Sequence, residues 1–171
     1  MASVLRILFV GMLINIQHTF SQNNLYVGSH RFDANYTWPF TINGGWIQGD
    51  GEVTFAKHGS GGMLMLAVKD FNGNIKGDIY IYLQDGSAIK CVDRSIKDNV
   101  DHYSMSLYYL TNVEVEKIKK SNIHDIRFAI YKYPFGSTSY TMSNQYTNYG
   151  DPYNTQTNQT AIEIEILMNK D

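Results

Sequence analysis

The residues with the clearest potential for molecular recognition lie in a long polar segment near the C-terminus. Residues 134–158 carry one charged side chain, Asp151, among many serines, threonines, asparagines and glycines. Four tyrosines lie in this segment: Tyr140, Tyr146, Tyr149 and Tyr153. Tyrosine among small polar residues is typical of recognition loops, because its rigid ring offers contact area while the polar neighbours adapt their hydrogen bonds. We therefore expect a binding loop here; a mobile loop without a ligand is the alternative.

The two tryptophans, Trp38 and Trp46, could extend this site as an aromatic platform for sugar rings. Packing in the core is the alternative for both, and it is favoured for a side chain of this size. The predicted binding residues are thus the four tyrosines of the loop together with these two tryptophans.

A group of three acidic residues suggests a metal site. Asp93, Asp98 and Asp101 could supply oxygen ligands to Ca²⁺, but they lack the spacing of a calcium-binding loop. Arg94 and Lys97 offer them salt-bridge partners, so a solvated loop is favoured. We expect no metal site and no cofactor.

A hydrolase is the least favoured chemistry. Asp50 and Glu52 are two residues apart and would face the same side of a strand, with His102 as a further candidate. The carboxylate pairs of glycosidases usually come from different strands, which local spacing does not establish. The chain also has no Gly-x-Ser-x-Gly elbow and no glycine-rich phosphate loop followed by lysine. We therefore do not expect an enzyme.

Charge and cysteine content argue against a nucleic-acid-binding protein and against a disulfide-stabilised fold. The 14 basic residues are scattered among 16 acidic ones, for a net charge of −2, so there is no basic stripe for nucleic acid. Cys91 is the only cysteine, which rules out an internal disulfide. It should be a buried small apolar residue, with a nucleophile or an intermolecular bridge as alternatives.

The N-terminus has the pattern of a secretory signal peptide. Arg6 precedes an apolar run from Ile7 to Ile16, and small residues follow at Thr19 and Ser21. We expect residues 1–21 to be removed and the protein to be secreted or periplasmic. No second apolar run is long enough to span a membrane, so no span is expected in the mature chain.

The strongest structural pattern is a hairpin with strands over 79–83 and 88–92, joined at Asp85-Gly86. A two-residue turn would place Tyr82 opposite Ile89 and Tyr80 opposite Cys91. Both faces would then be apolar, which predicts a central hairpin that is covered on both sides.

The other segments complete a mainly β chain. Residues 63–69 are apolar on both faces and predict a central strand, and alternation from Ile162 to Met168 predicts a C-terminal strand. Thr111 and Glu114 form a capping box, which predicts a short helix over 112–120 that packs Val115 and Ile118 on the sheet. We expect residues 22–171 to form one domain, an antiparallel sandwich or open barrel of about eight strands with one short helix.

Residues 75–128 resemble a segment of uncharacterised small secreted β-rich proteins of flavobacteria. The resemblance covers the hairpin, the Cys-Val-Asp-Arg that begins at Cys91, and the unit from Leu110 to Phe128. It implies a bacterial secreted β-rich module and brings no activity or catalytic residue with it.

The function predicted from these observations is a secreted, non-enzymatic module that binds a carbohydrate or an extracellular protein through its aromatic loop. A structural or adhesive protein that assembles through exposed strand edges near residues 36–40 is the first alternative. A glycan-acting hydrolase is the second.

Overall fold

The computed structural model describes residues 23–27, 29–44, 47–69, 73–100, 102–147 and 155–170. The expected signal peptide, Trp46, Asp101, Tyr149 and Tyr153 lie outside these ranges. The elements in chain order are β1 (Asn23–Val27), β2 (His30–Ala34), β3 (Trp38–Gly44), β4 (Ile47–His58), β5 (Gly61–Lys69), β6 (Asn74–Ile75), β7 (Ile79–Leu83), β8 (Ala88–Cys91), β9 (Lys97–Val100), β10 (Tyr103–Leu110), α1 (Asn112–Lys120), β11 (Ile123–Lys132), β12 (Gly136–Ser143), β13 (Tyr146–Thr147), β14 (Thr155–Gln156) and α2 (Thr160–Met168).

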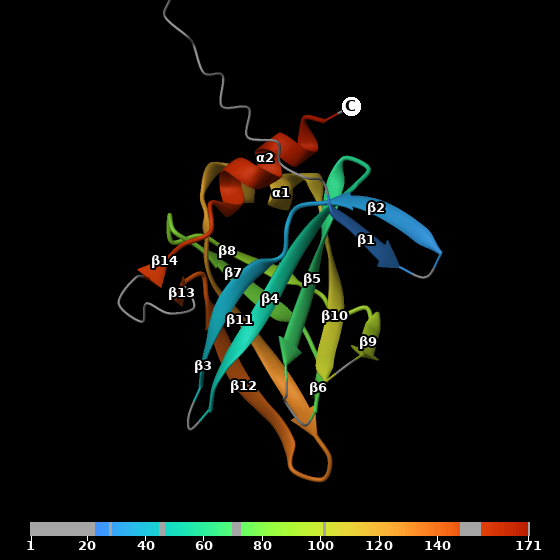
Figure 1. The fold of residues 1–171 in the computed structure, drawn as a ribbon, viewed down its shortest axis with the longest axis vertical. Coiled ribbons are helices and arrows are strands. Elements are labelled where there is room, and N and C mark those ends of the chain that lie inside the picture. Colours follow the sequence, from blue (N-terminus) through green and yellow to red (C-terminus); the bar gives the residue numbers. More distant parts are fainter. Residues whose placement is uncertain are drawn as a thin grey trace, which may run out of the picture.

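Nine strands form one curved antiparallel sheet in the order β8-β7-β11-β12-β3-β4-β5-β10-β9. The sheet curls into a half-barrel, and α1 and α2 lie together across one end of it (Figure 1). The hairpin of β1 and β2 joins the sheet through a pairing of β2 with β4. This arrangement confirms the expected mainly β fold in its open-barrel form.

The core fills the concave side of the half-barrel. Phe40, Phe55 and Phe128 are among its largest buried side chains, and each is at most 2% exposed. A second apolar cluster lies on the convex side, where the β1–β2 hairpin packs against β4, β5 and β10. Because β5 is buried on both faces, the prediction of a central strand at residues 63–69 is confirmed.

Local sequence determines α1 as predicted. The Thr111 hydroxyl accepts from the Glu114 N–H at 3.3 Å, and the Glu114 carboxylate accepts from the Thr111 N–H at 2.7 Å. These bonds satisfy two backbone donors that a helix start otherwise leaves unpaired. Val115 and Ile118 are buried beneath the helix, which confirms its expected apolar face.

The prediction of a C-terminal strand is wrong, because residues 160–168 form helix α2. The alternation of isoleucine and glutamate coexists with a second pattern, in which Ala161, Ile164 and Leu167 are spaced as on one face of a helix. Those three residues are buried, whereas Ile162 is 55% exposed. The Asn122 side chain accepts from the Ala161 N–H at 2.9 Å, so a residue outside the helix caps its first turn.

The predicted register of the β7–β8 hairpin is also wrong. Leu83 and Ser87 close a three-residue connection, with the Leu83 N–H bonded to the Ser87 carbonyl at 2.9 Å and Gly86 at φ 85°. Tyr82 therefore pairs with Ala88 and Tyr80 with Lys90, a shift of one residue from the two-residue turn. A shift of one residue turns side chains to the opposite face. The hairpin is accordingly not central: β8 ends the sheet order, and one face remains open.

The segment 134–158 is not a single loop, because β12 occupies residues 136–143 and pairs with both β11 and β3. Its alternate residues turn inward, and Met142 is fully buried. The stretch near residues 36–40, expected as an exposed edge, contributes Trp38 and Phe40 to the core. β3 lies between β12 and β4 in the sheet order, so the assembly edge predicted there is not supported.

Candidate functional site

The three predicted aromatic residues that the structure describes, Trp38, Tyr140 and Tyr146, have separate surroundings. Trp38 is 2% exposed and packs in the core, where its indole N–H donates to the Glu163 carboxylate at 2.8 Å. The Tyr140 ring stacks on Phe128 at 5.9 Å between centroids and packs against the same core. Tyr146 is half-buried and donates its hydroxyl to Gln156 at 2.9 Å. Trp38 is therefore a core residue and Tyr140 is a partly buried residue packed against the core, so their surroundings do not favour the predicted binding role.

Two of the three acidic residues expected in a charged loop, Asp93 and Asp98, accept hydrogen bonds from neighbouring groups of the chain. The Asp93 carboxylate accepts from the N–H groups of Gly77 and Ser95 and from the Lys97 ammonium, each at 2.7 Å. Asp98 accepts from the N–H of Asn99 at 2.8 Å. Asp101 lies outside the described residues, and within them no three His, Cys, Asp or Glu side chains are grouped as metal ligands.

Replacement of Asp93 by alanine should destabilise the fold by about 2–3 kcal/mol, because two backbone N–H groups and an ammonium lose their acceptor. Burial raises the pKa of Asp93, but the bonds from Lys97, Ser95 and Gly77 outweigh it and leave the pKa below its ordinary value. A lowered folded pKa stabilises the protein above the unfolded value of about 4, and this contribution is lost as the pH falls through the folded pKa. Urea unfolding from pH 7 to pH 2 should show the deficit of the variant shrinking below about pH 4. A deficit that is independent of pH would contradict the role of the charge.

Two of the residues suggested for hydrolysis, Asp50 and Glu52, lie on β4, and the third, His102, precedes β10. The Glu52 carboxylate accepts from the Tyr103 hydroxyl at 3.1 Å. Asp50 pairs with Thr41 in the β3–β4 ladder, and His102 occupies the turn between β9 and β10 with φ 70°. Nothing in these contacts aligns the three side chains for proton transfer.

Cys91 is 2% exposed in the core, which confirms its expected burial. Burial, with a smaller contribution from nearby carboxylates, raises the pKa of its thiol to about 12. A thiol with this pKa is almost entirely protonated at neutral pH and is a poor nucleophile.

The structure instead presents an open polar and aromatic surface on the convex side of β7, β11 and β12, which we call the β11 face. Its residues are Tyr80 and Tyr82 from β7, Asp125, Arg127 and Tyr131 from β11, and Ser139 and Thr141 from β12. Inward and outward residues alternate along each strand, so these side chains share one side of the sheet. Tyr80 is 40% exposed and Tyr82 is 37% exposed.

Strand register fixes how the β11 face is arranged. Tyr82 lies opposite Asp125, and Tyr80 lies opposite Arg127. On the other side of β11, Arg127 lies opposite Thr141. A shallow pocket of about 470 Å³ is lined by Tyr82, Asp125, Arg127, Ser139 and Thr141. The tyrosine rings of β7 therefore lie beside the polar side chains of β11 and β12 on paired strands.

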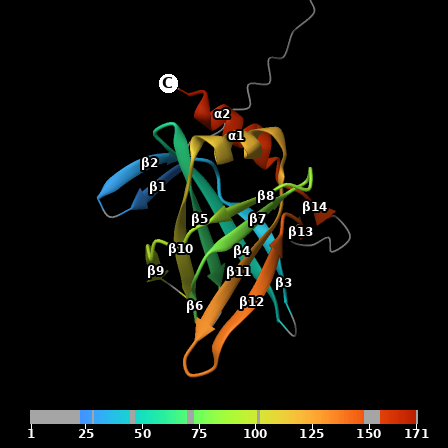
Figure 2. The same ribbon diagram turned by 180° about the vertical axis from the view of Figure 1, so that it is seen from behind.

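The β11 face is open, whereas the opposite half of the convex side is covered. The β1–β2 hairpin packs over β4, β5 and β10 there, with Leu25 and Leu107 buried in the contact. In the view from behind, no other labelled element lies in front of β7, β11 and β12 (Figure 2).

Asp125 and Arg127, the two charged residues of the β11 face, differ in their contacts. Asp125 accepts from the Ser143 hydroxyl at 2.6 Å and contacts the His124 ring nitrogen at 2.7 Å. Within the described ranges, no side chain forms an ion pair or hydrogen bond with the Arg127 guanidinium. The guanidinium is therefore available to a ligand.

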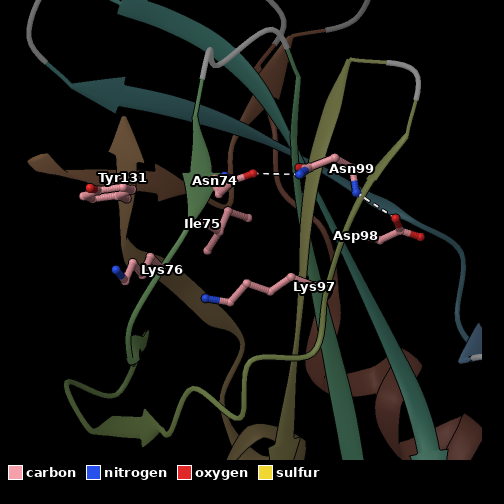
Figure 3. Close-up of a pocket in the computed structure, with 7 residues that line it drawn as sticks. All are labelled: Asn74, Ile75, Lys76, Lys97, Asp98, Asn99 and Tyr131. Atoms are coloured by element: carbon pink, nitrogen blue, oxygen red, sulfur yellow. Dashed lines mark hydrogen bonds between the residues drawn. The ribbon is translucent and has the colours of Figure 1, made fainter. Parts of the chain in front are cut away.

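A second pocket of about 570 Å³ lies where β6 bridges β11 and β9, at the Tyr131 end of the β11 face. Asn99 donates to Asn74 at 2.7 Å across this junction (Figure 3). The Lys76 ammonium lies 4.4 Å from the centroid of the Tyr131 ring. Figure 3 shows Asp98 on the far side of the pocket from Lys76 and Tyr131. The end of the face thus carries a cation beside an aromatic ring.

Tyr80 and Tyr82 were missed as surface residues because the two-residue turn assigned both faces of the hairpin to the core. The pattern Ile-Tyr-Ile-Tyr-Leu from Ile79 to Leu83 was the available signal, since it places tyrosine on one side and aliphatic residues on the other. The same alternation separates Arg127 from its neighbours Ile126 and Phe128.

Comparison of the chain with protein families found no matching family, and neither characterised proteins nor solved structures showed a significant match. None of the helices in the described ranges has the length and hydrophobicity that crossing a bilayer requires. What the structure establishes is the class of fold, a mainly β antiparallel half-barrel with two short helices.

Proposed function

We propose that the protein is a secreted, non-enzymatic binding module that recognises carbohydrate through the β11 face. The observation that carries this proposal is the pair of exposed rings, Tyr80 and Tyr82, beside polar side chains on an uncovered part of the sheet. A sugar ring has apolar C–H faces and a rim of hydroxyl groups. Tyrosine rings can stack on the C–H faces, and arginine, serine and threonine side chains can form hydrogen bonds with the hydroxyl groups.

The composition of the face favours carbohydrate over a protein partner. The centre of a protein interface is usually apolar and depleted in charged groups. Here the pocket residues next to Tyr82 are Asp125, Arg127, Ser139 and Thr141, whose side chains all carry groups that can donate or accept hydrogen bonds. The open shape also suits an extended polysaccharide that lies along the strands.

The strands place the two rings at a defined spacing. Tyr80 and Tyr82 are two residues apart on β7, which corresponds to about 7 Å along an extended strand. Their backbones are held in ladders with β8 on one side and β11 on the other. Binding therefore requires little ordering of the protein, which lowers its entropic cost.

The test is to replace both tyrosines, Tyr80→Ala with Tyr82→Ala, and to measure binding to a panel of immobilised polysaccharides by affinity electrophoresis. Losing two ring contacts should weaken binding by about tenfold or more, at roughly 0.5–1.5 kcal/mol per aromatic contact. The matched control, Tyr26→Ala with Tyr36→Ala, removes two rings that are 64% and 43% exposed outside the face. Equal binding by the two double variants would refute the proposed site, and no binding of any polysaccharide by the wild-type protein would refute the function.

A further inference from the structure

We infer that the carbohydrate bound by the β11 face is an acidic polysaccharide whose sugar units carry carboxylate groups. This inference rests on the proposed function and names its class of ligand. It depends on Arg127 of the face and Lys76 at its Tyr131 end, neither of which forms an ion pair with a carboxylate of the described residues.

Arg127 is the first of these cations. It lies at the centre of the face, between Tyr80 on β7 and Thr141 on β12. Its side chain is exposed. A guanidinium presents parallel N–H donors that match the two oxygens of a carboxylate. An acidic sugar stacked near Tyr80 could therefore direct its carboxylate to Arg127.

Lys76 is the second cation. Its backbone N–H is bonded to the Ala129 carbonyl at 3.0 Å, which fixes the residue beside β11. Its ammonium faces the Tyr131 ring, as Figure 3 shows, and no described carboxylate forms an ion pair with it. Tyr131 is four residues beyond Arg127, or roughly 13 Å along the strand. Two cations at different points along the strand suit a chain in which every sugar unit carries an acidic group, because such a chain offers carboxylates at several distances.

One acidic side chain, Asp125, belongs to the face itself, and the others near it are paired with lysines or lie away from it. Asp78 pairs with Lys90 at 2.8 Å, and Asp93 pairs with Lys97 at 2.7 Å. Asp125 is bonded to Ser143 and contacts His124. Asp98 lies across the second pocket from Lys76. Although the whole chain has a net charge of −2, Arg127 and Lys76 together outweigh the single carboxylate of the face, Asp125.

The probes are polygalacturonate and alginate, each compared with its esterified form, in which the sugars are the same and the carboxylate charge is removed. The wild-type protein should bind at least one acidic polymer about tenfold more tightly than its ester at low ionic strength. The preference should shrink as salt is added, because exposed charges are screened.

Charge variants test the contribution of the two cations to binding while the tyrosine rings stay in place. Arg127→Gln with Lys76→Gln should bring the affinity for the acidic polymer close to that for its ester. Lys69→Gln with Lys57→Gln, on β5 and β4, removes two charges outside the face and should leave the preference unchanged. Circular dichroism of all variants verifies folding.

Each remaining outcome decides one of the two claims. Equal binding of an acidic polymer and its ester would overturn the inference while leaving carbohydrate binding intact. Binding only to neutral polysaccharides, or only to dextran sulfate, would also overturn it, the latter by identifying sulfate as the recognised group. Failure to bind any polysaccharide would refute the proposed function itself.

Discussion

Replacing Asn144 by alanine is expected to destabilise the protein by about 3–5 kcal/mol, since several buried groups would lose their partners together. Asn144 is 2% exposed. Its amide donates to the carbonyls of Ile123 at 2.7 Å and Asn158 at 3.0 Å. The side-chain oxygen of Asn144 accepts from the backbone N–H of Asn158 at 3.0 Å and from the side-chain amide of Asn158 at 2.7 Å.

These bonds hold three parts of the chain together: the end of β12, the start of β11 and the segment before α2. Buried polar networks of this kind are costly to interrupt because water does not replace the lost partner. Urea unfolding, monitored by circular dichroism, measures the loss. Asn43→Ala, an exposed position on β3, is the matched control and should change stability by no more than about 0.5 kcal/mol. A loss below about 1 kcal/mol for Asn144→Ala would show that the network is not a principal tie in the fold.

Replacing Trp38 by alanine is expected to cost about 3–5 kcal/mol, as is usual when a large buried aromatic is truncated. Trp38 packs in the main core with Phe40 and Ile164. Its bond to Glu163 also ties β3 to α2. Burial raises the pKa of Glu163, and the hydrogen bonds from Trp38 and Asn35 oppose that rise. The indole therefore contributes both volume and a partner for a half-buried carboxylate.

Trp38→Phe separates these contributions, because it retains most of the ring and loses the N–H. We expect it to cost about 1–2 kcal/mol, close to the value of one hydrogen bond to a charged group. The same variants distinguish a core residue from a sugar platform. A Trp38→Ala protein with unchanged stability and lost polysaccharide binding would restore Trp38 to the binding site and contradict its assignment to the core.

The proposed binding surface, the β11 face, is built on strands. Tyr80, Arg127 and Thr141 are neighbours through backbone ladders, so their relative positions follow from strand register. Sites built on strands hold their side chains more accurately than sites built on loops. A ligand can therefore meet an arrangement that already exists in the free protein.

Several features of this protein were determined by the sequence alone. The capping box of Thr111 and Glu114 involves neighbours in the chain, so it predicted α1 without tertiary information. The apolar character of both faces of residues 63–69 required burial on both sides and predicted a central β5. The absence of a second cysteine likewise left core packing to hold the domain together. In each case, the deciding interactions were local or followed from composition.

The tertiary structure decided the rest. Residues 160–168 satisfy both a strand pattern and a helix pattern, and the distant Asn122 and Trp38 select the helix. Gly86 in a three-residue connection sets a register that exposes Tyr80 and Tyr82, although the sequence Asp85-Gly86 also allows a two-residue turn. Which half of the convex side is covered depends on where the β1–β2 hairpin packs. These outcomes depend on contacts between residues far apart in the chain, and small differences in local pattern cannot specify such contacts.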